Sequence, residues 1–340
     1  MNEVISMSTK ELDRLKIMDQ LSLKLITQRQ AADILSVSTR QIRRLVREYR
    51  IHGPKGIVSK RRGKASNRSL PISKVELATA LIEQKYVNFG PTLAHEKLVK
   101  IHSLDISVSS IRNLMISNGL WSERRKKKKN IHQLRERRAK EGELIQIDGS
   151  PHAWFEERGP KASLLLSVDD ATSKIMNGIF APTEALWPYF ELLSSYVVEH
   201  GRMMALYCDK HSVFKVNREG ALSGDGITQF GRAMKDLGIK MIFANSPQAK
   251  GRIERANRTL QDRLVKELRL QDISTIEEAN AFLPQFIKEY NRKFAVIPRS
   301  PDNAHRPLLK EHNLDLIFTL HSFRTLSKNL TFQYANTIYQ

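Results

Sequence analysis

Five short apolar runs, joined by turns and amphipathic segments, constrain the fold of this chain more than any other feature of its sequence. They lie at residues 144–148, 163–168, 174–180, 205–209 and 240–244. Runs of this length and composition are typical of β-strands. The first three follow each other closely, whereas a helix-like segment precedes each of the last two. This order predicts a mixed sheet with helices packed on it, which is an α/β fold.

Two of these strands end in a carboxylate, Asp148 in the first and Asp209 in the fourth. If the two strands are neighbours, the acids lie side by side, and a helix laid across that edge brings Glu254 to them. Three converging carboxylates repel each other unless cations lie between them. Mg²⁺ suits such a site because it prefers oxygen ligands and retains positions for water and phosphate. Two such ions about 3.5–4 Å apart can promote phosphoryl displacement without a protein nucleophile.

The sequence around Glu254 is strongly basic. Five cationic side chains flank it: Lys250, Arg252, Arg255, Arg258 and Arg263. One explanation is a helix-surface ion pair between Glu254 and Arg258, four residues apart, worth about 0.3–0.5 kcal/mol. The other is that Glu254 binds a metal ion while the bases bind a polyanion.

The charge balance of the whole chain indicates a polyanionic partner. The 340 residues include 56 Lys and Arg against 36 Asp and Glu, a formal net charge of +20. We expect nucleic acid as the partner, with an anionic membrane surface as the alternative. No apolar run approaches the roughly 20 residues of a membrane span, so we expect no membrane-embedded segment.

Composition also limits the compartment and the chemistry. A hydrophobic share of 41% is enough for folded cores. The single cysteine, Cys208, excludes an intrachain disulfide framework and a cysteine-rich zinc site. The N-terminal segment contains acids and no apolar core, unlike a secretion signal. A reducing, cytoplasmic location is therefore expected.

Residues 1–53 have the pattern of a helix-turn-helix DNA-binding domain. Thr27 is the expected N-cap of its second helix, with Gln30 three positions later as in a capping box. The small residues Ala31 and Ala32 let another helix approach closely.

The third helix of this domain has the composition of a recognition helix. Ile42, Leu45, Val46 and Tyr49 share one apolar face at helical spacing. The DNA-binding candidates off that face are Arg40, Gln41, Arg43, Arg44 and Arg47. Arg and Gln side chains contact phosphates and base edges. The alternative is an ordinary basic helical hairpin.

The rest of the chain divides by composition. We expect a basic linker at 54–72, a second helix-turn-helix-like domain at 73–122 and another basic linker at 123–140. The linkers either bind phosphates, which would make DNA binding strongly salt dependent, or serve only as tethers. The second helical domain either reads DNA or is a structural bundle. Residues 141–297 form the expected catalytic core, and residues 298–340 end in one or two strands, too few for an independent β domain.

Three segments resemble the DDE transposases of bacterial insertion sequences. They are QIDGSPHAWFEERGP (146–160), YCDKHSVF (207–214) and ANSPQAKGRIERANRTLQDRL (244–264). The resemblance is closest to the ISNCY-type group, in the retroviral integrase superfamily. It implies a ribonuclease H-like integrase catalytic core that uses Mg²⁺ or Mn²⁺, as two ions, to cleave DNA and transfer strands at transposon ends. It also implies a catalytic and metal-binding triad of Asp148, Asp209 and Glu254.

The same resemblance implies the partners. They are double-stranded DNA, as terminal inverted repeats and as target, and further copies of this chain, because two transposon ends must be brought together. A nucleoid-associated bacterial protein is expected. The alternative is a non-catalytic, transposase-derived protein that binds DNA and represses its element. A ribonuclease H-like nuclease without transfer activity would not need two helix-turn-helix units.

Two features depart from the family pattern. Seven residues after the catalytic glutamate the superfamily often has Lys or Arg, whereas this chain has Gln261, so Arg258 is expected to take that role. Relatives tend to continue into a β-rich C-terminal domain, and residues 298–340 are expected to be an incomplete form of it.

Other residues near the acids have two interpretations. Lys210, Lys250, Arg255 and Arg258 are candidates for contacts with the DNA backbone. Asn257, three residues after the glutamate, either steadies it or contacts DNA.

The remaining polar and aromatic residues near the site carry weaker signals. Asp169 and Asp170 fit a hairpin turn better than a metal site. His152 and His211 either orient a water or phosphate, or make ordinary polar contacts. The residues expected to be buried are Trp154, Trp187 and Cys208.

Overall fold

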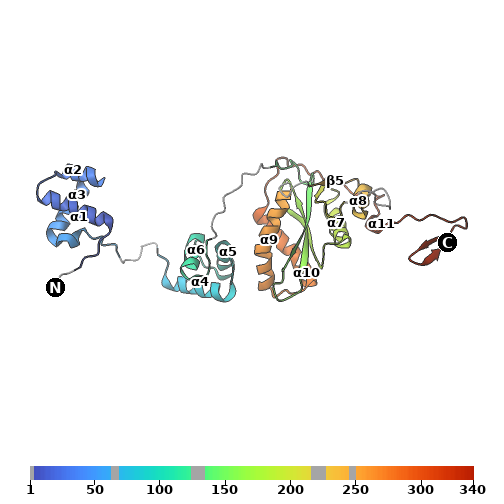
Figure 1. Ribbon diagram of the computed structural model, residues 1–340, viewed down its shortest axis with the longest axis horizontal. Coiled ribbons are helices and arrows are strands. Elements are labelled where there is room, and N and C mark those ends of the chain that lie inside the picture. The colour runs from blue at the N-terminus through green and yellow to red at the C-terminus, as the bar shows by residue number, and fades with distance from the viewer. Residues whose placement is uncertain (1–3, 63–68, 124–134, 216–226, 245–249) are drawn as a thin grey trace. The chain divides into compact units, whose positions relative to one another are not determined.

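The computed structural model describes residues 4–62, 69–123, 135–215, 227–244 and 250–340. The chain forms two compact units, Met1–Glu76 and Leu77–Gln340, whose elements are labelled in Figure 1. In the described ranges, no helix is both long enough and apolar enough to cross a membrane.

The described part of the first unit includes the helices α1 (Thr9–Ser22), α2 (Gln28–Leu35) and α3 (Thr39–His52). Thr27 and Gln30 form the predicted capping box at the start of α2. Ser38 caps α3 by accepting a hydrogen bond from the backbone N–H of Gln41. These caps fix the first residues of α2 and α3. A short turn separates the end of α2 from the start of α3.

The predicted inner and outer faces of α3 are both present. Ile42 and Leu45 are buried in one core with Ala31 and Ala32, so the small pair does permit close approach. Of the DNA-binding candidates, Gln41 is half-buried and the exposed ones are Arg40, Arg43, Arg44 and Arg47.

The first unit extends beyond the boundary that the sequence predicts. The 3₁₀-helix Gly53–Ile57 follows α3 directly, and Ile57 is buried in the helical core. The backbone N–H of Ser59 donates to Glu11 Oε1 over 2.7 Å. The linker predicted at 54–72 is therefore wrong in its first residues, because these pack against the helices.

Three more helices follow, α4 (Ile72–Lys85), α5 (Pro91–His102) and α6 (Val108–Ser117). Ser107 caps α6 by accepting a hydrogen bond from the backbone N–H of Ser110. Leu98 is buried, whereas Val99 is 41% exposed. The buried face of α5 is formed by Pro91, Leu93, Ala94 and Leu98.

A five-stranded sheet of described residues forms the centre of the second unit. Its strands are β1 (Ile145–His152), β2 (Ala162–Asp169), β3 (Ile175–Ala181), β4 (Ala205–Cys208) and β5 (Lys240–Phe243). The order is β3-β2-β1-β4-β5, with β1, β2 and β3 antiparallel and β4 parallel to both neighbours. The predicted mixed α/β sheet is confirmed. The first and fourth strands are neighbours, which is the condition on which the sequence places Asp148 and Asp209 side by side.

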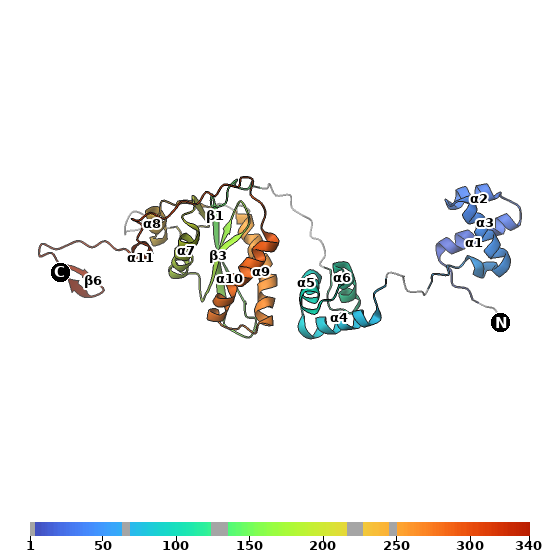
Figure 2. The same ribbon diagram turned by 180° about the vertical axis from the view of Figure 1, so that it is seen from behind.

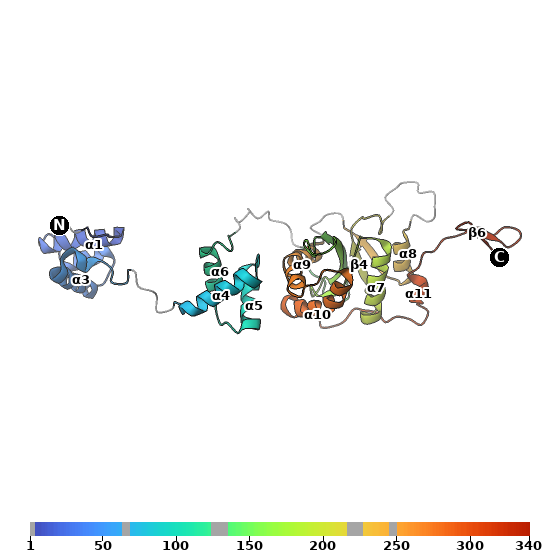
Figure 3. The ribbon, with the colours of Figure 1, turned by 90° about the horizontal axis from the view of Figure 1, so that it is seen from below.

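Helices cover both faces of this sheet (Figures 2 and 3). One apolar core lies between the sheet and α7 (Leu186–His200) with α8 (Gln229–Asp236). The other lies between the sheet and α9 (Gly251–Leu270) with α10 (Ile276–Phe294). Ile145 and Ile147 belong to the first core, so the alternate residues of β1 face α9.

The C-terminal part contains α11 (Leu314–Ile317) and a hairpin of β6 (Phe332–Tyr334) and β7 (Thr337–Tyr339). This hairpin corresponds to the strands predicted there. It forms a separate two-stranded sheet.

Two of the three residues predicted to be buried are so. Trp154 is fully buried, and Cys208 lies in β4 with no exposure. Trp187 is 54% exposed, so its predicted burial is wrong. The inner face of α7 is formed instead by Tyr189 and Phe190.

Candidate active site

Asp148 lies where β1 extends beyond its parallel neighbour β4. The pairing of these two strands stops at Gln146, and Asp209 follows directly after β4. The sequence predicts that Asp148 ends its strand, but β1 continues to His152 because its other edge remains paired with β2. Asp148 therefore sits on a rigid strand, at the place where the neighbouring strand leaves room beside it.

A series of hydrogen bonds aligns β1 with α9. Alternate residues of the strand meet every fourth residue of the helix, because two strand residues span about 6.7 Å and four helical residues about 6 Å. The bonds run from Ile253 N to Gln146 Oε1 (3.1 Å), from Asn257 Nδ2 to Asp148 Oδ2 (3.2 Å) and from Gln261 Nε2 to Ser150 Oγ (3.0 Å). This register fixes the position of the helix that carries Glu254.

Lys250, at the start of α9, joins the two aspartates. Its Nζ lies 2.5 Å from Asp148 Oδ1 and 3.4 Å from Asp209 Oδ2. The residue is only 6% exposed. Burial alone would lower the pKa of its ammonium, but Asp148 and Asp209 raise that pKa above its ordinary value. The group therefore stays charged and forms a cationic bridge between the acids.

The charge on Asp148 is only partly compensated. Burial raises the pKa of its carboxyl group, and the charge of Asp209 raises it further. Lys250 and the hydrogen bond from Asn257 oppose this rise without cancelling it. The ionised form of this carboxyl group is therefore less favourable here than in water.

Glu254 lies on the exposed side of this cluster. Partial burial raises the pKa of its carboxyl group, and Asp148 raises it further, with Lys250 acting in the opposite direction. Glu254 is thus close enough to Asp148 for their negative charges to repel each other. Among the described residues, however, no three Asp, Glu, His or Cys side chains converge closely enough to hold a metal ion.

A fourth acid, Glu184, adjoins the site and is missed by the sequence reasoning. It precedes α7, and a Cβ built on Gly149 would lie 2.1 Å from its Cδ. Burial and then the charge of Asp148 raise its pKa, while His211 lowers it. Tyr189 donates to its Oε2 over 3.4 Å. The only signal in the sequence is the glycine after Asp148, which leaves space for another side chain.

The donor chemistry of the site fits Mg²⁺ or Mn²⁺. The side chains of Asp148, Asp209 and Glu254 offer hard oxygen ligands of the kind these ions prefer. A cation, the Lys250 ammonium, already lies between two of them. An ion could bind at that position only after Lys250 moves away.

Comparison with known proteins places the chain in a family. A profile described as a helix-turn-helix domain matches residues 13–65. A provisionally named transposase of Sinorhizobium fredii, y4bF, is 44% identical over 332 residues, which are 97% of this chain and 72% of that protein. The transposase for insertion sequence IS1202 of Streptococcus pneumoniae is 30% identical over 328 residues, 83% of this chain and 69% of that protein.

The chain belongs to the insertion-sequence transposase family. A chain of the simian T-cell lymphotropic virus intasome, solved in complex with PP2A regulatory subunit B56 gamma, aligns with 70% of this chain and 79% of its own length. It is 15% identical, with a TM-score of 0.38, and supports no conclusion about this transposase.

The transposase has a second pair of acids, Asp169 and Asp170, at the end of β2. Asp169 Oδ1 accepts hydrogen bonds from the backbone N–H and the hydroxyl of Thr172, at 2.7 and 2.6 Å. Its Oδ2 accepts from Gly142 N over 3.0 Å. Burial nevertheless raises the pKa of the Asp169 carboxyl group. These contacts confirm the predicted turn.

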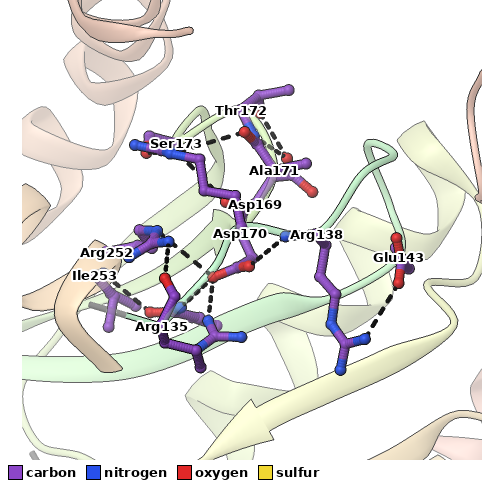
Figure 4. Close-up of polar contacts among 12 residues, drawn as sticks. Arg135, Arg138, Glu143, Asp169, Asp170, Ala171, Thr172, Ser173, Arg252 and Ile253 are labelled. Atoms are coloured by element: carbon purple, nitrogen blue, oxygen red, sulfur yellow. Dashed lines mark hydrogen bonds and ion pairs between the residues drawn. The ribbon is translucent and has the colours of Figure 1, made fainter. Parts of the chain in front are cut away.

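Asp170 is fully buried among fixed donors (Figure 4). Its Oδ1 accepts from Gln146 Nε2 over 2.8 Å and pairs with the guanidinium of Arg135. Arg252 Nε lies 3.7 Å from the same oxygen, and the backbone N–H of Arg138 donates to Oδ2 over 2.9 Å. Asp170 therefore fixes the end of the basic linker to the core.

This contact also corrects the predicted extent of that linker. Its last residues, 135–140, pack on the core rather than forming a free tether. Residues 124–134 of this predicted linker lie outside the described residues.

The DNA-binding candidates of the core fall into two groups. Lys210, Arg255 and Arg258 are exposed. Lys250 is buried against the acids, so in this state it is not available to a DNA backbone. Gln261, which replaces an expected base, is half-buried and bonded to β1, which explains why a neutral amide fits there.

The two histidines make ordinary contacts. The backbone N–H of His211 donates to Asp209 Oδ1 over 2.8 Å, so this residue holds the acid through its main chain. The ring of His152 lies edge-on to Trp154, with centroids 5.3 Å apart.

Proposed function

We propose that this transposase binds the terminal inverted repeats of its insertion sequence and catalyses metal-dependent DNA cleavage and strand transfer. The observation that carries the proposal is the cluster of Asp148 and Asp209 from neighbouring strands, bridged by one cation, with Glu254 on the adjoining helix. A mixed sheet with this order and these flanking helices is, in our proposal, a ribonuclease H-like catalytic core.

Each acid has a role in this proposal. Asp148, Asp209 and Glu254 would hold Mg²⁺ or Mn²⁺, as two ions. Such ions supply Lewis-acid stabilisation of the charge that develops on the attacked phosphate. Asn257 orients Asp148 through the 3.2 Å hydrogen bond to its Oδ2. The register of α9 on β1 keeps Glu254 beside that carboxylate.

The bases would bind the DNA. The exposed arginines of α3 would contact the terminal repeat, with the apolar face of that helix held in the core of the first unit. Arg255 and Arg258 lie on the exposed side of α9, next to Glu254, and would bind the backbone of the strand that is cut. The net charge of +20 supports this partner.

Assembly follows from the reaction. Joining two transposon ends to one target requires at least two copies of the chain on DNA. The substrate would place this activity at the bacterial nucleoid, in the cytoplasm.

Strand transfer by the full chain tests the proposal. The substrate is a labelled duplex that carries the element's terminal repeat, with a supercoiled plasmid as target and Mg²⁺ or EDTA in the buffer. We expect cleaved and joined products in Mg²⁺ alone, and neither product with Asp209→Asn or Glu254→Gln. Gel-shift binding of the repeat should be retained by both variants. Joining at the wild-type rate by either variant would refute the assignment of these acids as catalytic residues.

A further inference from the structure

Lys250 is the one buried lysine among the described residues. Desolvation makes an unpaired buried ammonium costly, so its position needs strong compensation. The compensation comes from two carboxylates, Asp148 on β1 and Asp209 directly after β4, at 2.5 and 3.4 Å. A lysine in a surface ion pair remains largely in contact with water, whereas 94% of the surface of Lys250 is shielded from it.

The ammonium also limits the repulsion between the acids. Its Nζ lies 2.5 Å from Asp148 Oδ1 and 3.4 Å from Asp209 Oδ2, so the two negative charges lie close together on either side of one positive charge. Two carboxylates this close repel each other when no cation lies between them.

The Lys250 side chain can move away from the aspartates without displacing α9 from β1. It occupies the N-cap position of α9, ahead of the first helical turn. Asn257 and Gln261 hold the helix to β1 about two and three turns further along. The flexible four-carbon side chain can therefore turn outward while Glu254 keeps its place.

We propose that Lys250 is a positioning residue that holds Asp148 and Asp209 together in the metal-free transposase and gives way when a divalent ion enters. The ammonium and the ion compete for the same carboxylate oxygens, and like charges cannot share them. The released side chain is then free to bind a DNA phosphate, the contact that the sequence predicts for it. This inference rests on the proposed function in one respect, that these acids bind metal.

Mn²⁺ binding to the full chain tests the proposal without any DNA reaction. Isothermal titration compares the wild type with Lys250→Met. Removal of the competing ammonium should tighten Mn²⁺ binding by about tenfold, within the usual range for coupled sites. Arg255→Met removes the same charge one residue from Glu254, so it controls for the effect of losing any positive charge near the site. It should change the affinity by less than about threefold, because an exposed charge is screened.

A second readout separates positioning from simple structural support. In EDTA, Lys250→Met should melt lower than the wild type, by about 2–4 °C. Saturating Mn²⁺ should close most of that gap, because the ion replaces the ammonium and binding is linked to stability. Lys250→Gln serves as the second variant if Lys250→Met does not fold.

The outcomes distinguish this proposal from the proposed function. If the wild type binds Mn²⁺, Asp209→Asn does not, and neither Lys250 variant binds more tightly, the role of Lys250 is refuted and the metal site stands. A melting gap that persists at saturating Mn²⁺ also refutes it. If the wild type and both Lys250 variants all fail to bind Mn²⁺, the metal site of the proposed function fails, and the role of Lys250 with it.

Discussion

Two pairs of acids lie along the same sheet, and they differ in how their charges are compensated. We call Asp169 and Asp170 the closed pair and Asp148 and Asp209 the open pair. The closed pair is 0% exposed and is held by backbone N–H groups and by arginines. The side chains of the open pair are 20% and 47% exposed and share one lysine.

In our proposal, this difference separates a structural role for the closed pair from a catalytic role for the open pair. A buried carboxylate surrounded by fixed donors stabilises a fold and cannot accept a new ligand without losing those contacts. A pair held by one flexible ammonium can exchange that cation for another. Position in the sequence does not distinguish the pairs, because all four acids follow or extend apolar strands.

The largest expected effect is on catalysis by the open pair. Asp148→Asn should lower strand transfer by at least about 10³-fold, because loss of a metal ligand removes several kcal/mol of charge stabilisation. The isosteric change Asp170→Asn should leave the rate within about tenfold, as expected for a contact outside the site. Single-turnover joining of a labelled terminal repeat measures both. Equal losses would mean that the two pairs do not differ in function.

The next effect is on stability and falls on the closed pair. Asp170→Ala should lower the free energy of unfolding by about 3–5 kcal/mol, because it leaves Arg135 and Arg252 without their buried partner. The control is Asp262→Ala, which breaks the exposed pair with Lys266 and should cost about 0.5 kcal/mol or less. Urea unfolding measures both. A loss below about 1 kcal/mol for Asp170→Ala would contradict the structural role of the closed pair.

A smaller effect is expected at Asn257, which orients the open pair from α9. Asn257→Ala should weaken Mn²⁺ binding and slow joining by about tenfold, the size expected for a residue that orients a metal ligand. Gln261→Ala is the matched control, since it removes the next hydrogen bond of the same series but touches no acid. Equal effects of the two changes on Mn²⁺ affinity would show that only the packing of the helix matters.

The smallest effect is a pH dependence at Glu254. Its pKa is raised above 4.5, so the folded state binds this proton more tightly than the unfolded state does. Ionisation therefore costs stability above the raised pKa, and the cost vanishes below the ordinary value. Glu254→Gln should be more stable than the wild type at pH 7 by a few tenths of a kcal/mol, after screening by solvent.

Urea unfolding in EDTA at pH 4 and pH 7 checks this sign. The advantage of Glu254→Gln should shrink at pH 4, where the wild-type carboxyl group is largely protonated. The exposed Glu157 provides the control, since Glu157→Gln should show a smaller change between the two pH values. An advantage of Glu254→Gln that grows at low pH would mean that the carboxylate is stabilised by its surroundings.

The sequence predicts the fold well, because the strands are continuous apolar runs that their neighbours bury on both faces. It misplaces the end of β1, since Gly149 and Pro151 usually interrupt a strand. In this protein β2 pairs with the whole of β1 and keeps it extended.

The sequence predicts less of the site. It identifies the acids but not the role of Lys250. A lysine near a carboxylate fits a DNA contact and an internal ion pair equally well, and only the burial of Lys250 in the structure distinguishes these two roles. Glu184 could not be found, because its contact with Gly149 joins parts of the chain that only the packing of the sheet brings together.

Iron-directed cleavage of the protein's own backbone tests the central claim most directly, that the open pair and Glu254 bind the metal. Fe²⁺ in place of Mg²⁺, with ascorbate and peroxide, cuts peptide bonds close to the bound ion. We expect cuts near Asp148, Asp209 and Glu254, suppressed by excess Mg²⁺ and lost in Asp209→Asn. Cuts near Asp170 that persist in Asp209→Asn would contradict the account.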